Sequence, residues 1–220
     1  VVPVVDPNDY ISLIKDLNEN TTISYNKRRQ LCAKAFGHTA QYDTIIHNYL
    51  KEDPLSEDFS LTFKKHSEMR YGENPHQSAA SFSIPGNQER NILNATIHQG
   101  KQLSYNNIMD ADGALACLKE FDKPACVIVK HSNPCGVATG DNLLDSYKKA
   151  FNADSLSAFG GIVALNRTCT AKIADEISKV FIEIVLAPNY EEQALAILKK
   201  KKNLRVLEIG TISRRDKKVE

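Results

Sequence analysis

The residues of this sequence best suited to chemistry are Lys130 and His131, a lysine and a histidine side by side. A neutral imidazole can take a proton near neutral pH, and a fixed ammonium beside it can stabilise an oxyanion as charge develops. The pair follows the apolar run 125–129 and precedes Asn133-Pro134. We predict a general base and an electrostatic stabiliser here, with the solvated end of a strand as the alternative.

The element that positions this pair is the run 125–129, which is apolar at every residue. Such a pattern predicts a strand buried on both faces, as in a mostly parallel sheet. Pro134 cannot donate to a ladder and Gly136 tolerates tight turns, so we expect the strand to end there. Because ligands of open α/β sheets bind at the carboxyl ends of strands, Lys130 and His131 should lie in an active site.

Strands and helices alternate along the second half of the chain, which predicts an α/β fold. The turn Pro85-Gly86-Asn87 makes 78–84 and 92–98 a predicted hairpin. The apolar periodicity and the caps predict helices over 7–17, 25–53 (closed by Pro54), 107–121, 142–152, 171–181 and 190–202, and further strands over 1–5, 61–65, 159–165, 183–186 and 204–209.

The first strand and two helices have no sheet partner nearby in sequence, so they resemble the tail of a preceding domain. We expect the chain to divide into 1–55 and 56–220. It opens without Met and ends on the polar run 214–218, which predicts a piece of a longer protein.

Composition describes an ordinary globular chain: 220 residues, 42% hydrophobic and 25% charged. The net charge of +1 gives no case for a nucleic acid or a membrane surface as partner. No apolar run approaches the roughly 20 residues of a membrane helix, and no signal peptide opens the chain. The five cysteines are scattered, which predicts reduced thiols and a cytoplasmic protein.

Three other polar or glycine-containing segments could bind a ligand. The loop 70–77 contains Arg, Tyr, Glu, Asn and His, and arginine suits a phosphate or carboxylate; a surface loop is the favoured alternative. The paired glycines of 157–161 allow a close backbone approach, or equally a bulge or tight packing. The lysines of 199–202 are typical of a solvated helix end, although a single one could reach a phosphate.

A zinc site of the deaminase type requires H-x-E together with P-C-x-x-C. Pro134-Cys135 is present, but position 138 is Ala and position 133 is Asn. The ligand set is incomplete, so we expect no catalytic zinc and assign no residue to a metal.

Several of these segments occur together in order: RYGENPHQ at 70–77, NIMDA at 107–111, VKHSNPCG at 129–136 and SAFGG at 157–161. This combination resembles the AICAR formyltransferase/IMP cyclohydrolase family of purine biosynthesis, where AICAR is phosphoribosylaminoimidazolecarboxamide. The resemblance runs along essentially the whole chain.

The resemblance implies two parts. Residues 1–55 would be the C-terminal end of the cyclohydrolase domain, a Rossmann-like fold of the methylglyoxal-synthase type, with linker helices. Residues 56–220 would be the first of two cytidine-deaminase-like three-layer α/β/α units of the formyltransferase domain, without zinc. That domain transfers a formyl group from 10-formyltetrahydrofolate to the 5-amino group of AICAR. The family forms homodimers with active sites at the subunit interface.

Carried over by position, His131 would be the base and Lys130 would stabilise the oxyanion or the leaving folate nitrogen. The substrate-binding residues would be Arg70, Tyr71, His76, Asn107, Gly160, Glu183 and Lys202. The second unit, with most of the folate contacts, is outside the sequence. We therefore expect the 220 residues alone to bind AICAR weakly and not to catalyse. The alternative function is a non-catalytic structural or dimerisation module.

Overall fold

A computed structural model describes residues 1–53 and 55–212 of the chain. The chain divides into two compact units between Lys64 and Lys65, and each is described by itself. Pro54, predicted to close a helix, and the polar run 214–218 lie outside the described residues. No helix in the described part of the chain is long and apolar enough to cross a membrane.

The first unit is built on two helices, α1 (Tyr10–Asn20) and α2 (Tyr25–Leu50), with a single 3-10 turn at Pro7–Asp9. Both predicted helix starts are confirmed, because Asp6 caps the 3-10 turn that leads into α1 and Ser24 caps α2 through side-chain hydrogen bonds to backbone N–H groups.

The strand predicted over 1–5 is wrong, because those residues are assigned to no strand and pair with none in the described part of the unit. Val2 and Val4 instead pack against a small cluster formed by Leu13, Ile23 and Leu31.

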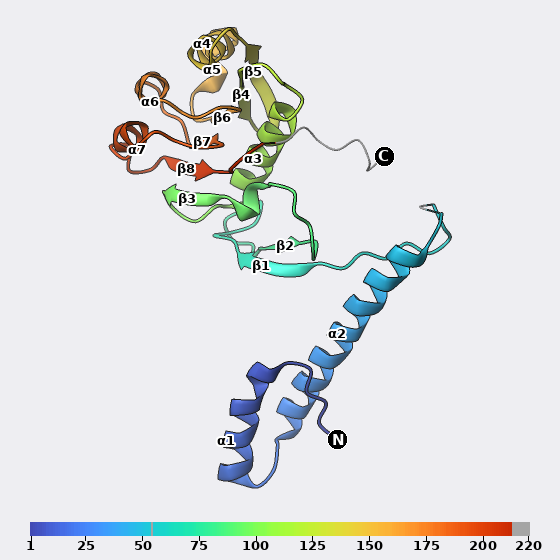
Figure 1. The fold of residues 1–220 in the computed structure, drawn as a ribbon. Helices are drawn as coiled ribbons and strands as arrows, with labels where there is room; N and C mark the ends of the chain where they lie inside the picture. The colour runs from blue at the N-terminus through green and yellow to red at the C-terminus, as the bar shows by residue number, and fades with distance from the viewer. Residues whose placement is uncertain (54, 213–220) are drawn as a thin grey trace. The chain divides into compact units, whose positions relative to one another are not determined.

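The second unit is organised around a six-stranded mixed sheet in the order β3-β8-β7-β6-β4-β5 (Figure 1). Strands β6, β7 and β8 are parallel, β4 is antiparallel to both of its neighbours, and β3 is antiparallel to β8. The predicted α/β class is confirmed. The strands are β3 (Thr96–Gln99), β4 (Ala125–Lys130), β5 (Asn133–Thr139), β6 (Ile162–Leu165), β7 (Ile184–Ala187) and β8 (Arg205–Glu208).

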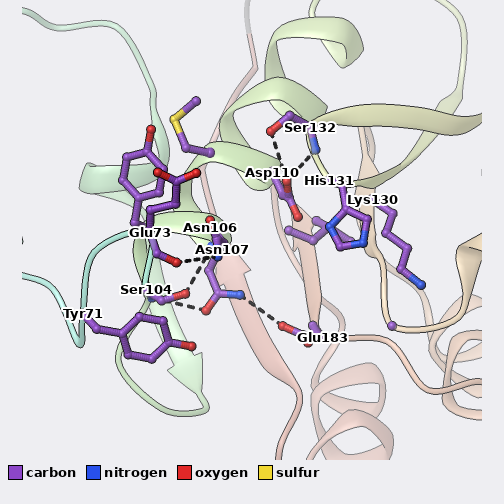
Figure 2. Close-up of a pocket in the computed structure, with 14 residues that line it drawn as sticks. Tyr71, Glu73, Ser104, Asn106, Asn107, Asp110, Lys130, His131, Ser132 and Glu183 are labelled. Carbon is purple, nitrogen blue, oxygen red and sulfur yellow. Dashed lines mark hydrogen bonds between the residues drawn. The ribbon is translucent and has the colours of Figure 1, made fainter. Parts of the chain in front are cut away.

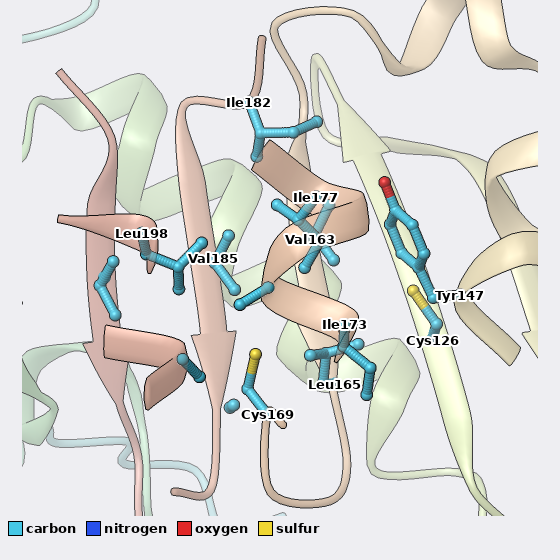
Figure 3. Packing of buried hydrophobic residues seen from close by; sticks show 14 of the residues in the cluster. Cys126, Tyr147, Val163, Leu165, Cys169, Ile173, Ile177, Ile182, Val185 and Leu198 are labelled. Carbon is cyan, nitrogen blue, oxygen red and sulfur yellow. The ribbon is translucent and has the colours of Figure 1, made fainter. Parts of the chain in front are cut away.

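Helices cover both faces of this sheet, because successive strand residues point to opposite sides. Val127 and Val129 of β4 pack on the side of α3 (Tyr105–Leu118). Cys126 and Ile128 pack on the opposite side, which α4, α6 and α7 cover. Figure 3 shows Cys126 on that side next to Tyr147, a residue of α4. These helices are α4 (Leu143–Ala153), α6 (Ala171–Ser178) and α7 (Glu192–Leu198), and the short α5 (Ser155–Ala158) lies between α4 and β6 in sequence. Residues 125–129 are all buried, as predicted.

The predicted hairpin of 78–84 and 92–98 is wrong. Its turn is real, since Asn87 N–H donates to Ile84 O at 3.2 Å. However, β2 (Ala80–Ser83) pairs with β1 (Lys64–Glu68) in a separate two-stranded sheet, and β3 pairs with β8 at the far end of the chain. The local turn signal therefore located the reversal of the chain but not the partners of its strands.

The predicted end of the strand after Lys130 is confirmed, because β4 ends at that residue. The reason given for it is wrong, because Pro134 and Gly136 belong to the next strand, β5. The chain reverses at His131-Ser132, and Pro134 lies within β5, opposite Val129. Proline is tolerated there because β5 is the edge strand of the sheet. The mostly parallel surroundings predicted for β4 are wrong for the same reason: a hairpin partner on one side and β6 on the other both run against it. The other predicted elements are present, with ends that differ by a few residues.

Candidate functional site

The direction of β4 decides which residues can meet Lys130 and His131. Because β4 runs against β6, its carboxyl end lies beside the amino ends of the parallel strands, as the pairing of Val129 with Ile162 shows. The same edge continues through the first residues of β7 and β8. Residues that immediately precede those strands can therefore reach the pair. Lys130 and His131 thus lie at the carboxyl end of a core strand, as predicted, but the parallel strands present their amino ends there.

A cavity of about 490 Å³ lies at this edge (Figure 2). Its wall combines the start of α3, the turn between β4 and β5, and the segments that lead into β6 and β7. The predicted site residues that line it are Tyr71, Asn107, Lys130, His131, Gly160 and Glu183.

Asn107 is fixed by a capping box at the start of α3. Its backbone N–H donates to Ser104 Oγ at 3.4 Å, and its Oδ1 accepts from Ser104 N–H at 3.2 Å. Its Nδ2 donates to Glu183 Oε2 at 3.1 Å, which links α3 to the segment before β7. One N–H and one lone pair of the amide remain for a ligand.

Glu183 is supported from behind by a buried cation. Arg205 Nη1 lies 3.8 Å from Glu183 Oε2, and Arg205 Nε donates to Lys101 O at 3.2 Å. The Arg205 side chain is 9% exposed, whereas that of Glu183 is 43% exposed. The carboxylate is thus an oriented acceptor that faces the cavity.

Lys130 is held by the backbone that leads into β6. Its Nζ donates to Phe159 O at 2.7 Å, which leaves the remaining ammonium protons for another acceptor. The next residue, Gly160, has φ +75°, a conformation that costs other residues about 1–2 kcal/mol. Its N–H donates to Phe181 O at 2.7 Å. Glycine suits this position because it adopts a positive φ without a steric cost.

His131 lies at the tip of the hairpin of β4 and β5. Its carbonyl accepts from Asn133 Nδ2 at 2.9 Å. The following residue, Ser132, donates its N–H to Asp110 Oδ1 at 2.6 Å, so the tip is tied to α3. The imidazole is therefore presented by a short, braced turn on the cavity wall (Figure 2).

Arg70, His76 and Lys202 lie outside this cavity. Arg70 and His76 line a separate hollow of about 520 Å³ beside β1, and the Arg70 guanidinium lies 5.3 Å from the Tyr71 ring. Lys202 lines a third hollow, of about 300 Å³, between the ends of α6 and α7. The structure therefore separates these three residues from the other predicted site residues.

Comparison of the sequence with known proteins identifies its family. A model of the AICARFT/IMPCHase bienzyme family matches residues 1–220. The chain belongs to this family.

Similar proteins from three bacteria carry the name bifunctional purine biosynthesis protein PurH. The chain is 45% identical to that of Caldicellulosiruptor saccharolyticus over 222 aligned residues, which cover 98% of this chain and 43% of the relative. It is 48% identical to that of Acetivibrio thermocellus, over 97% of this chain and 42% of the relative. It is also 48% identical to that of Listeria monocytogenes, over 95% and 42%. The chain thus spans less than half the length of these curated relatives.

Sequence reasoning missed several residues of the cavity in this AICARFT/IMPCHase chain, notably Ser104, Asp110 and Ser132. Ser104 has a local signal, since a serine three residues before Asn107 is a typical helix N-cap. Asp110 has none, because its partner Ser132 lies 22 residues further along the chain.

From the sequence, no residue of this AICARFT/IMPCHase chain was assigned to a metal ion. Across 1–53 and 55–212, the structure brings together no group of three or more His, Cys, Asp and Glu side chains that could hold a metal ion.

Proposed function

We propose that this chain contributes an AICAR formyltransferase site to a bifunctional enzyme of de novo purine biosynthesis. The reaction would move a formyl group from the co-substrate 10-formyltetrahydrofolate to the 5-amino group of AICAR, giving FAICAR. Ring closure to IMP would belong to the cyclohydrolase part of the whole protein. The observation that carries the proposal is the convergence of Lys130 and His131 with Asn107 and Glu183 on one cavity, in a chain of this family.

The roles of Lys130 and His131 follow from the chemistry of the nucleophile. The amine of AICAR is a poor nucleophile, because its lone pair is delocalised into the ring that bears the carboxamide. In the proposal, His131 accepts the proton of the amine as its nitrogen bonds to the formyl carbon. Lys130 stabilises the negative charge that develops on the formyl oxygen, using ammonium protons not engaged by Phe159 O. Breaking the bond to the folate nitrogen, which takes up a proton, completes the transfer.

The other cavity residues would orient the nucleotide. The Glu183 carboxylate can accept hydrogen bonds from hydroxyl or amino groups, and the free edge of the Asn107 amide suits a carboxamide. Tyr71 adds a neutral hydroxyl, and the backbone at Gly160 can approach a ligand closely.

Arg70, His76 and Lys202, which the resemblance assigns to the substrate, line other hollows. We include a homodimer in the proposal, because a second copy could combine these side chains with a cavity of the first. This arrangement would supply the phosphate contacts that an arginine or lysine makes well.

The proposed domains follow the resemblance. Residues 56–220 would be a cytidine-deaminase-like unit, supported by a mixed sheet with helices on both faces. Residues 1–55 would end a methylglyoxal-synthase-like cyclohydrolase domain. All five cysteines are free thiols, which supports the cytoplasm as the compartment we propose.

The test replaces His131 with Ala in the full-length protein. Loss of a positioned base should lower kcat by about 10²–10⁴-fold, while AICAR binding by calorimetry changes little. His66→Ala is the control, because His66 is exposed on β1 and does not line the cavity. Near-normal turnover of His131→Ala would contradict the assignment.

A second arm assays the 220-residue chain alone. It should bind AICAR weakly and not turn over, because holding two reactants in register can supply up to roughly 7–11 kcal/mol and needs the rest of the protein. Turnover near that of the full-length enzyme would contradict this. Absence of formyl transfer in the full-length protein would favour a structural or dimerisation module instead.

A further inference from the structure

The turn that carries His131 has an unusual backbone. It contains two residues, His131 and Ser132, between the paired positions Lys130 and Asn133. Their φ angles are +54° and +60°, so both are left-handed. This is the geometry of a type I′ hairpin turn, for which Asn-Gly is the usual sequence. A residue with a Cβ costs about 1–2 kcal/mol in this conformation, and this turn has two of them.

Such a conformation persists only where the surroundings hold it. Asp110 does so from α3: its Oδ1 accepts the Ser132 N–H at 2.6 Å and the Ser132 hydroxyl at 3.3 Å. A carboxylate that accepts from N–H forms a strong, short hydrogen bond. Figure 2 shows Asp110 and Ser132 joined next to His131.

The support itself is rigid. The residues after Asp110 on α3 include Ala111, Ala114 and Leu115, each 0% exposed and packed on the sheet. The Asp110 carboxylate is thus fixed relative to β4, and β4 in turn fixes Lys130. On the side of β5, the Asn133 side chain donates to the His131 carbonyl. Among the described residues, no other side chain of β5 is hydrogen-bonded to His131.

We propose that Asp110 is a positioning residue for His131. Its carboxylate holds the left-handed turn so that the imidazole leaves the hairpin toward the cavity. The proposal rests on the proposed function, in which His131 is the base. Without the brace, the turn can relax to other geometries that direct residue 131 elsewhere, and a misplacement of about 1 Å can cost on the order of 10²-fold in rate. The loss should appear in kcat more than in KM, because the turn backbone, not the nucleotide contacts, is changed.

The experiment compares three variants of the full-length protein. Asp110→Ala should lower kcat by roughly 10–100-fold with little change in the KM for AICAR. Asp110→Asn keeps a side-chain oxygen for the Ser132 N–H and should keep most of the activity. Ser132→Gly in the Asp110→Ala background should restore much of kcat, because glycine adopts positive φ without a brace. Thermal melting of each variant establishes that it is folded.

Outcomes separate the proposal from its alternatives. Asp110→Ala with parental kcat, where His131→Ala is inactive, would overturn it. Equal losses in Asp110→Ala and Asp110→Asn, with no rescue by Ser132→Gly, would also overturn it and indicate that the charge of Asp110 acts on the substrate.

A measurement that does not depend on turnover tests the brace even if the proposed function is wrong. The three-bond HN–Hα couplings of His131 and Ser132, measured by NMR in the 220-residue chain, report φ directly. They should change in Asp110→Ala and remain parental in Asp110→Asn. If His131→Ala is fully active, the proposed function fails, whereas unchanged couplings in Asp110→Ala would overturn the brace itself.

Discussion

Gly136 allows helix α4 to lie directly against strand β5. A Cβ at this position would collide with the carbonyl oxygen of Ala150 and would lie 2.8 Å from its carbonyl carbon. These are backbone atoms inside a helix, so they cannot move aside without distorting α4. Glycine is needed here for close packing of a strand against a helix. The sequence pattern had instead predicted that Gly136 serves a tight turn.

Gly136→Ala should therefore lower the free energy of unfolding by about 3 kcal/mol, the upper end of the usual cost of overpacking. Gly113→Ala is the matched control in the same unit. Its added Cβ would meet nothing closer than Ser132 O at 3.9 Å, and alanine should stabilise α3 by about 0.5–1 kcal/mol. Urea unfolding followed by circular dichroism measures both, and a Gly136→Ala variant as stable as the parent would contradict the close approach.

Individual residues of the site were predictable where their chemistry is local. Lys130 and His131 are adjacent in sequence and follow a short apolar run typical of a buried strand, so their place at a strand end followed from the sequence. The convergence of Gly160 and Glu183 on them was expected from the family resemblance alone, because it depends on β4 running against β6. A single residue type cannot report the direction of a neighbouring strand.

The start of α3 connects helix stability to the candidate site. Both residues line the cavity and form the capping box, but in the part of the chain that the structure describes it is Asn107 whose side chain also donates to Glu183. The two residues therefore separate the stability of the helix from the orientation of the carboxylate.

Ser104→Ala should cost about 1 kcal/mol of stability, the usual value for a lost N-cap, with AICAR affinity retained. Asn107→Ala should cost a similar amount and also weaken AICAR binding in the full-length protein by about tenfold or more, because it frees Glu183 and removes a proposed ligand contact. Thermal unfolding and calorimetric titration distinguish the effects. Equal AICAR affinity in the two variants would contradict the role given to Asn107.

Elements were predictable where periodicity and caps agree, and strand partners were not. The turn at Pro85-Gly86 was located from its residue types, yet the strands on either side of it pair in different sheets. The formation of a turn depends on residues that are neighbours in sequence. The pairing of strands depends on which strand, often distant in sequence, offers a matching edge. Pro134 was misjudged for a related reason, since proline is excluded from central strands and the sequence does not state which strand is at the edge.

At the scale of the whole second unit, the core contains cysteine thiols and tyrosine hydroxyls whose burial favours the protonated, neutral form. Burial raises the pKa of Cys169 from its ordinary value of 9.0 to about 12, with a smaller contribution from the Glu191 carboxylate. Burial likewise raises the pKa values of Cys126, Tyr147 and Tyr190. The Tyr190 hydroxyl, which has one proton to donate, lies 3.0 Å from Val185 O and 2.9 Å from Leu207 O.

These groups predict loss of stability in alkali. Above pH 9 an unfolded thiol releases its proton while the folded Cys169 keeps it until about pH 12, so the folded state binds more protons and the free energy of unfolding falls as pH rises. Each such group contributes a slope of up to about 1.4 kcal/mol per pH unit. Cys169→Ala should show a shallower decline between pH 9 and 11 in urea unfolding. At pH 7 the Cys169 thiol is protonated in both the folded and the unfolded parent. The difference in the free energy of unfolding between variant and parent at that pH therefore gives the packing cost alone. Identical slopes would contradict the burial of this thiol as the cause.

The place of β8 between β3 and β7 has a consequence for synthesis of the chain. His98 of β3 and Glu208 of β8 are hydrogen-bonded at 2.7 Å but lie 110 residues apart in sequence. A ribosome that adds about 5–20 residues per second exposes β3 roughly 5–20 seconds before its partner strand is made. During that interval both β3 and the edge of β7 have unpaired backbone groups that can pair with another nascent chain. The unit is therefore most vulnerable to misassembly while it is being translated, and a chain that stops before Arg205 can never close its sheet.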